Sequence, residues 1–199
     1  SVSFQNAITP VSPPSAAELS GRESRRLLFY ARPEAHAARN MFEIGLMSLQ
    51  RAVESGVFGP EWSFHGIGTV EGGDRLRLTE DVALEILPRT GQADYGDLLA
   101  GHDVGLSLML TPHPSLPPIE MASAGMLTVT YSCENKTPAR LEAISSNLIA
   151  APPTVPGVVA ALAEAVAAVG DGERRVAGAA VNWSSDWETS LGPDVMDRV

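Results

Sequence analysis

The residue types best suited to ligand chemistry lie in one short stretch, residues 107–131. An apolar run leads into a proline-rich loop with His113 and Ser115, and the loop enters a predicted helix that carries Glu120. The backbone N–H groups at Ser115, Leu116 and further along this helix start could hold a phosphate, because the N-terminus of a helix attracts anions. His113 could donate to a phosphate or to a sugar hydroxyl. Glu120, if aimed sideways, would suit neutral hydroxyls such as the pair on a ribose.

Two further groups of residues follow the first two predicted strands. Arg32 comes directly after the first strand, where its guanidinium could pair with a diphosphate or form a surface salt bridge. Arg39, seven residues later, is a possible second cation for the same ligand. Gly66 and Gly68 end the second strand, where glycine allows a ligand or a neighbouring backbone to approach closely.

The pattern of apolar residues predicts the elements that must position these side chains. Short solid apolar runs, typical of buried parallel strands, alternate with helical patterns. We therefore predict an α/β fold with a Rossmann-like parallel sheet of about six strands and helices on both faces. The strands are expected at 26–30, 62–67, 82–87, 103–110, 126–130 and 147–149, and the helices at 36–54, 94–100, 117–124, 137–144 and 155–169. Residues 70–79 have no clear period and are predicted to be a loop.

Composition divides the chain into three parts. Residues 1–24 contain scattered prolines and serines and are interpreted as a linker or as the end of a preceding domain. Residues 25–169 form the α/β domain. Residues 170–199 are a polar tail with Trp183 and Trp187, which would pack either on this domain or against another one.

Charge and motif content exclude several functions. The chain has 199 residues and a net charge of −10, which disfavours binding to nucleic acid or to an anionic membrane. No apolar run is long enough to span a membrane. The sequence lacks the glycine-rich dinucleotide and P-loop motifs and the nucleophile elbow. It also shows no credible cluster of metal ligands, so we expect neither a metal nor a cofactor.

The string EMASAG at residues 120–125, followed by an apolar strand, resembles the signature of GT-B glycosyltransferases of the large group 1 family. The longer string SLMLTPHPSLPPIEMASAG, together with ENK at 134–136, resembles the rhamnosyltransferase-like branch of that family. The resemblance implies a C-terminal, donor-binding domain in which Glu120 holds the ribose of a nucleotide sugar. It also implies basic residues near Arg32 and Arg39, and a nucleobase pocket lined by the backbone of Leu87, Pro88 and Arg89.

The resemblance also implies the partners of the domain. The donor would be a nucleoside diphosphate sugar such as dTDP-rhamnose, and the glycan acceptor would bind to a preceding domain missing from this chain. The tail at residues 170–199 could then include a helix that crosses back to that domain. Many members carry a second glutamate eight residues before the first, and here that position is Pro112, so neither the sugar contacts nor a catalytic residue can be assigned. We expect a cytoplasmic protein whose association with a membrane, if any, occurs through the missing domain.

Two alternative functions fit the same fold. A non-catalytic module could bind a nucleotide sugar without transferring it, because a fold alone does not define a function. A sugar-nucleotide epimerase of related architecture would act on the donor without an acceptor.

Overall fold

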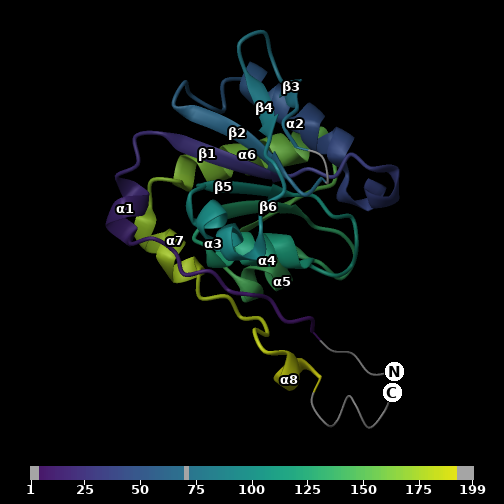
Figure 1. Cartoon of the computed structure of the whole chain (residues 1–199), viewed down its shortest axis with the longest axis vertical. Coiled ribbons are helices and arrows are strands. Elements are labelled where there is room, and N and C mark those ends of the chain that lie inside the picture. Colours follow the sequence, from purple (N-terminus) through teal and green to yellow (C-terminus); the bar gives the residue numbers. More distant parts are fainter. Residues whose placement is uncertain (1–4, 70–71, 192–199) are drawn as a thin grey trace.

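The fold is built on a single seven-stranded sheet with the strand order β3-β4-β2-β1-β5-β6-β7. The computed structural model describes residues 5–69 and 72–191 (Figure 1). Every pairing in the sheet is parallel except that of β3 with β4. The strands are β1 (Arg25–Tyr30), β2 (Trp62–Ile67), β3 (Arg75–Arg77), β4 (Ala83–Ile86), β5 (Val104–Ser107), β6 (Leu127–Tyr131) and β7 (Leu148–Ala151).

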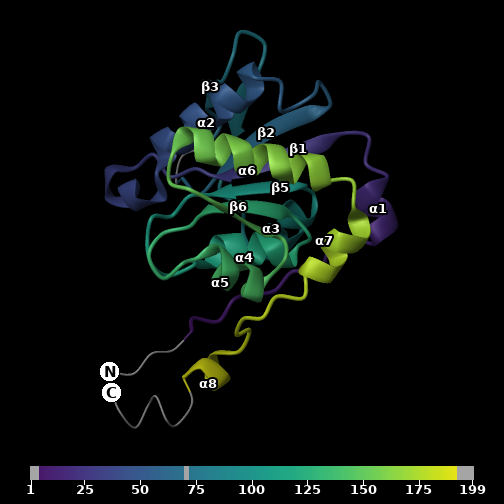
Figure 2. The same cartoon turned by 180° about the vertical axis from the view of Figure 1, so that it is seen from behind.

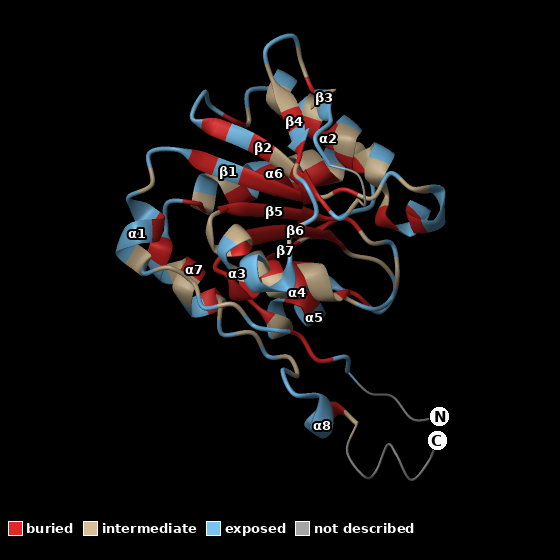
Figure 3. Ribbon diagram, viewed as in Figure 1, coloured by how far each residue is buried: buried red, intermediate tan, exposed pale blue. Residues whose placement is uncertain are grey.

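Helices cover both faces of this sheet, which confirms the predicted α/β class. Helices α2 (Phe42–Glu54) and α6 (Val155–Ala168) pack side by side on one face, as the view from behind shows (Figure 2). The opposite face carries α3 (Gln92–Ala100), α4 (Leu116–Ser123) and α5 (Pro138–Ile144). The helices therefore enclose the sheet, and β5 and β6 are buried along their whole length (Figure 3).

Strand β1 illustrates why solid apolar runs form the centre of this sheet. Successive side chains of a strand point to opposite faces. Leu27 and Phe29 enter the core cluster beneath α2 and α6, whereas Leu28 enters the cluster beneath α3 and α4. A central strand with helices on both sides thus needs apolar residues at every position rather than at alternate ones.

The strand order reverses between β1 and β5. From β1, the chain first builds β2 and β4 on one side and then returns to place β5, β6 and β7 on the other. In open α/β sheets, ligands bind at such a switch point, outside the carboxyl ends of the strands. The topology therefore indicates where a ligand site should be sought.

Two predictions about individual elements were wrong. Residues 75–77 form the short edge strand β3 rather than a loop, whereas residues 70 and 71 lie outside the described residues. The helix expected at 36–54 is divided into a 3₁₀ helix, η1 (Ala35–Asn40), and α2 by Met41, whose φ of 52° is left-handed. The segment interpreted as a linker or as the end of a preceding domain includes helix α1 (Ala16–Ser20), which begins with a capping box between Ser15 and Glu18.

The predicted polar tail also contains regular structure. Helix α7 (Gly172–Gly178) packs against α1, and the short helix α8 (Trp187–Ser190) follows. The segment before α1 and the segment after α7 lie next to each other, and the Ile8 N–H donates to Ser184 O at 2.9 Å. Trp183 Nε1 donates to Asn6 O at 2.9 Å, so this tryptophan contacts its own domain, whereas Trp187 is 51% exposed.

No single helix within residues 5–69 and 72–191 is long and apolar enough to cross a membrane. Helices α6 and α7 reach that length and apolar composition only as a pair, and they are bent by 116° relative to each other.

Candidate functional site

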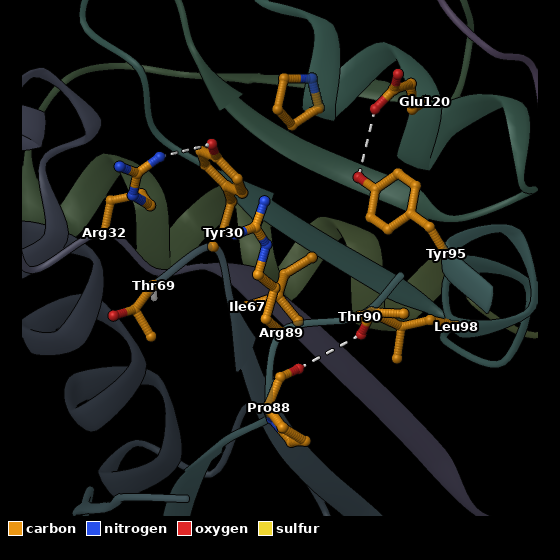
Figure 4. Close-up of a pocket in the computed structure, with 12 residues that line it drawn as sticks. Tyr30, Arg32, Ile67, Thr69, Pro88, Arg89, Thr90, Tyr95, Leu98 and Glu120 are labelled. Carbon is orange, nitrogen blue, oxygen red and sulfur yellow. Dashed lines mark hydrogen bonds between the residues drawn. The ribbon is translucent and has the colours of Figure 1, made fainter. Parts of the chain in front are cut away.

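A cavity of about 470 Å³ opens at the carboxyl ends of β1, β2 and β4, on the side of the sheet covered by α3 and α4. Residues from both sides of the topological switch point line it, since α4 follows β5 and the other segments follow β1, β2 and β4. Figure 4 shows these side chains around the cavity. The lining residues are Tyr30, Arg32, Ile67, Gly68, Thr69, Pro88, Arg89, Thr90, Tyr95, Leu98, Pro117 and Glu120.

Glu120 lies on α4 and faces this cavity, with a half-buried side chain. Its Oε2 accepts a hydrogen bond of 3.4 Å from the hydroxyl of Tyr95, which comes from α3 (Figure 4). Burial raises the pKa of the Glu120 carboxyl, and the hydrogen bond from Tyr95 opposes this effect. The carboxylate is thus an acceptor in a partly dry environment, where hydroxyl donors from a ligand would replace lost water.

The start of α4 differs from the expectation. The helix begins at Leu116, so Glu120 lies in its second turn, and the Glu120 N–H is directed to the carbonyl one turn earlier. Ser115 has a φ of 75°, and its N–H donates to His113 Nδ1 at 3.0 Å. Pro117 and Pro118 carry no N–H, so Leu116 provides the N–H that the first turn of the helix leaves for a ligand.

Arg32 lies at the end of β1 with its guanidinium held from several sides. Nε donates to Glu34 Oε2 at 3.0 Å, Nη1 donates to the hydroxyl of Tyr30 at 3.3 Å, and Nη2 lies 3.3 Å from His36 Nε2. These contacts fix the orientation of the guanidinium at the cavity wall. They also compensate part of its charge, because Glu34 forms an ion pair with it.

Arg89 is a second cation of the cavity, and the sequence predicted only a backbone role for it. It follows β4, its side chain is exposed, and it extends toward the space between Tyr30 and Tyr95 in the view of Figure 4. Within the described ranges, Arg89 forms no salt bridge. Its position directly after a strand end was the available signal for a charged ligand contact.

Glycine and proline bring the backbone close to the cavity. Gly68 has a φ of 108°, and a Cβ at this position would lie 2.9 Å from both Arg32 Cδ and Tyr30 Cε2. A side chain here would therefore collide with two residues of the cavity wall. Pro88 lines the cavity as well, whereas its neighbour Leu87 packs in the core beneath α3 and α4.

The other predicted site residues lie outside the cavity lining. Gly66 is buried within β2, where a Cβ would lie 2.7 Å from Ile86 Cδ1, so its small size serves packing within the sheet. Arg39 is exposed on η1, and its carbonyl accepts the N–H of Leu110. The ring of His113 packs edge-on against Trp183, with centroids 5.7 Å apart.

Of the predicted site residues, the cavity brings together Glu120, Arg32 and Pro88. It does not include Arg39, Gly66, Leu87, His113, Ser115 or Leu116.

The described residues contain no group of three or more His, Cys, Asp or Glu side chains that could hold a metal ion. His65 and His102 do meet, with 2.8 Å between Nδ1 and Nε2, but His102 Nδ1 is already engaged by Leu98 O at 2.7 Å. This pair joins β2 to the segment that follows α3, so His65 has a structural role.

Comparison with known proteins identifies a matching family and a curated relative. A family model described as "WsaF, C-terminal domain" matches residues 25–163. The O-antigen biosynthesis protein RfbC of Myxococcus xanthus is 37% identical over 148 residues, which are 71% of this chain and 10% of that protein. The chain therefore spans only a small part of this curated relative.

Solved structures resemble the fold at low sequence identity. WaaG, a glycosyltransferase involved in lipopolysaccharide biosynthesis, matches with a TM-score of 0.57 and 16% identity, over 88% of this chain and 49% of WaaG. The C-terminal domain of LpcC from Francisella tularensis, a group 1 glycosyltransferase, matches with a TM-score of 0.56 and 10% identity, over 92% of this chain and 94% of that domain. The similarity thus covers about half of a complete enzyme and nearly all of an isolated C-terminal domain.

Proposed function

Because this chain belongs to the family of the WsaF C-terminal domain and has the fold of one half of a GT-B glycosyltransferase, we propose that it binds the nucleotide-sugar donor of a glycosyl transfer reaction. The acceptor would be a glycan bound by another domain. The relationship to RfbC supports a cell-surface polysaccharide as the product, since that relative is named for O-antigen biosynthesis.

One observation carries this proposal, namely that the cavity places a carboxylate opposite two arginines. Glu120 lies on α4, whereas Arg32 and Arg89 follow β1 and β4 across the switch point. A nucleoside diphosphate needs both kinds of group: an acceptor for the sugar hydroxyls of the nucleoside and cations for the diphosphate. A site for a neutral sugar alone would have no use for the cations.

Each group then has a role in binding and in departure of the diphosphate. Glu120 accepts from the ribose or deoxyribose, and the backbone at Pro88 meets the nucleobase. Arg32 and Arg89 neutralise the diphosphate, which gains charge as the glycosidic bond to it breaks. His113, Ser115 and Leu116 lie outside the cavity lining and precede Pro117, which lines it, so they would contact only a part of the donor that extends beyond the cavity, such as the outer phosphate or the transferred sugar. The family resemblance of residues 107–136 favours dTDP-rhamnose as the donor.

Calorimetry with a panel of nucleoside diphosphates tests the proposal directly. We expect the chain to bind dTDP or UDP more tightly than GDP or ADP, and to catalyse no transfer by itself. Glu120→Ala should weaken binding by about 1–3 kcal/mol, the range for losing hydrogen bonds to a charged group. Glu43→Ala, an exposed residue of α2 on the opposite face, is the matched control and should change nothing.

The results that would overturn this assignment are distinct. If no nucleoside diphosphate binds, the donor-binding function is wrong. If binding survives unchanged in Glu120→Ala, the ligand lies elsewhere. If the full-length protein converts the donor without any acceptor, the reaction is that of an epimerase and not of a transferase.

A further inference from the structure

The hydroxyl of Tyr95 donates a hydrogen bond to one oxygen of the Glu120 carboxylate in the cavity. Tyr95 comes from α3 and Glu120 from α4, and the phenol donates to Glu120 Oε2 at 3.4 Å. Burial, followed by the charge of Glu120, raises the pKa of the Tyr95 hydroxyl far above its usual range. The phenol therefore keeps its proton at any physiological pH and remains a hydrogen-bond donor.

This contact limits how Glu120 can receive a sugar. The two oxygens of a carboxylate offer about four acceptor positions, and binding two vicinal hydroxyls side by side uses a position on each oxygen. Here the Tyr95 hydroxyl takes one position on Oε2, so Oε1 keeps more acceptor capacity for a ligand. A single hydroxyl, as on a 2′-deoxyribose, matches that arrangement.

We propose that Tyr95 is a specificity-determining residue, which holds one oxygen of Glu120 and thereby directs the site to nucleotides with one free sugar hydroxyl. This inference rests on the proposed function of the cavity. A ribonucleotide would have to share Oε2 with the Tyr95 hydroxyl, displace that hydroxyl, or leave its own 2′-hydroxyl without a partner. Each of these arrangements weakens or removes a hydrogen bond in a half-buried site, which disfavours binding.

The pair dUDP and UDP tests this inference, because the two ligands differ only in the 2′-hydroxyl. In the wild-type chain we expect dUDP to bind at least as tightly as UDP. Tyr95→Phe removes the competing hydroxyl and keeps the ring, so the ratio of affinities should shift in favour of UDP by about 3- to 10-fold, the effect of one hydrogen bond.

Tyr30→Phe is the matched control. Tyr30 also lines the cavity, but its hydroxyl accepts from Arg32 and makes no hydrogen bond to Glu120 in the described part of the chain. This variant should leave the dUDP to UDP ratio unchanged. Glu120→Ala in the Tyr95→Phe background should abolish the gain for UDP, because no side-chain acceptor then remains at this position.

The possible outcomes distinguish an error in the role of Tyr95 from an error in the proposed donor-binding function. Failure of both nucleotides to bind the wild-type chain would overturn the donor-binding function and the role of Tyr95 together. Binding of both with an unchanged ratio in Tyr95→Phe would overturn only the role of Tyr95. A wild-type preference of tenfold or more for UDP would do the same, since Glu120 would then already serve both hydroxyls.

Discussion

The two arginines of the cavity are held in different ways, which predicts different contributions to binding. Arg32 is tied to Glu34 and Tyr30, whereas Arg89 forms no salt bridge with any residue of the described ranges. An arginine without a carboxylate partner gives its full charge to a ligand, and such charge-assisted hydrogen bonds are the stronger kind.

Arg89→Ala should therefore weaken binding of a nucleoside diphosphate by about 1–3 kcal/mol and leave binding of the free nucleoside nearly unchanged. Titration calorimetry of the two ligands measures the difference. Arg39→Ala is the control, because Arg39 is exposed but does not line the cavity. Equal losses for nucleoside and diphosphate would show that Arg89 contacts the base or sugar instead.

At the residue scale, sequence reasoning located single side chains where a strand end and a helix start were both recognisable. Arg32 and Glu120 satisfy that condition and line the cavity. The sequence does not single out Tyr95 as a site residue, because its hydrogen bond to Glu120 joins two helices whose packing no local pattern reveals. His113 was placed near the phosphate from its loop position alone, and the contact of its ring with Trp183 depends on a segment seventy residues away.

At the element scale, Gly125 ends α4 and sets the direction of β6. It adopts a φ of 82°, as expected for the glycine that follows a helix. A Cβ at this position would lie 3.1 Å from Pro13 Cβ and 3.4 Å from Leu19 Cδ1. The left-handed backbone conformation and the close neighbouring atoms both disfavour a side chain at Gly125.

Gly125→Ala should reduce the free energy of unfolding by about 1–2 kcal/mol, because the left-handed backbone is strained for alanine. Urea denaturation followed by circular dichroism measures this loss. Gly170→Ala provides the control, since a Cβ there would meet nothing within 4 Å and its φ is not left-handed. The prediction is contradicted if both variants unfold at the same urea concentration.

Proline and glycine made α4 predictable, whereas the missed elements depend on contacts that no local pattern shows. The helix expected at 36–54 is broken at Met41, a residue with no special preference for a left-handed φ, so tertiary packing must impose the break. Strand β3 is three residues long and mostly polar, and only its pairing with β4 identifies it. Elements defined by long-range pairing leave little trace in a local pattern.

At the scale of the whole molecule, one buried carboxylate joins both ends of the described chain to the sheet. Asp103 precedes β5, and its Oδ1 lies 3.1 Å from Arg22, 3.2 Å from Arg25 and 3.0 Å from Arg175. Arg22 follows α1 and Arg175 belongs to α7, so the cluster holds this pair of helices against the amino ends of β1 and β5. Asp103 and Arg175 lie far from each other and from Arg22 and Arg25 in the sequence, and nothing in this spacing predicts that the four residues meet.

The cluster lies at the opposite end of the strands from the candidate site, so stability and binding should respond separately. Asp103→Asn leaves three arginines around a neutral side chain and should lower the free energy of unfolding by about 3–5 kcal/mol, as when one partner of a buried ion pair is removed. Arg22→Gln, at a partly exposed position, should reduce the free energy of unfolding less and leave nucleotide affinity unchanged.

Urea denaturation and calorimetry measure the two effects, with Asp97→Asn on the exposed side of α3 as the control. A loss in the free energy of unfolding below about 1 kcal/mol for Asp103→Asn would contradict this prediction. It would mean that water or rearranged carbonyls replace the carboxylate, because leaving a buried charge uncompensated costs more than that.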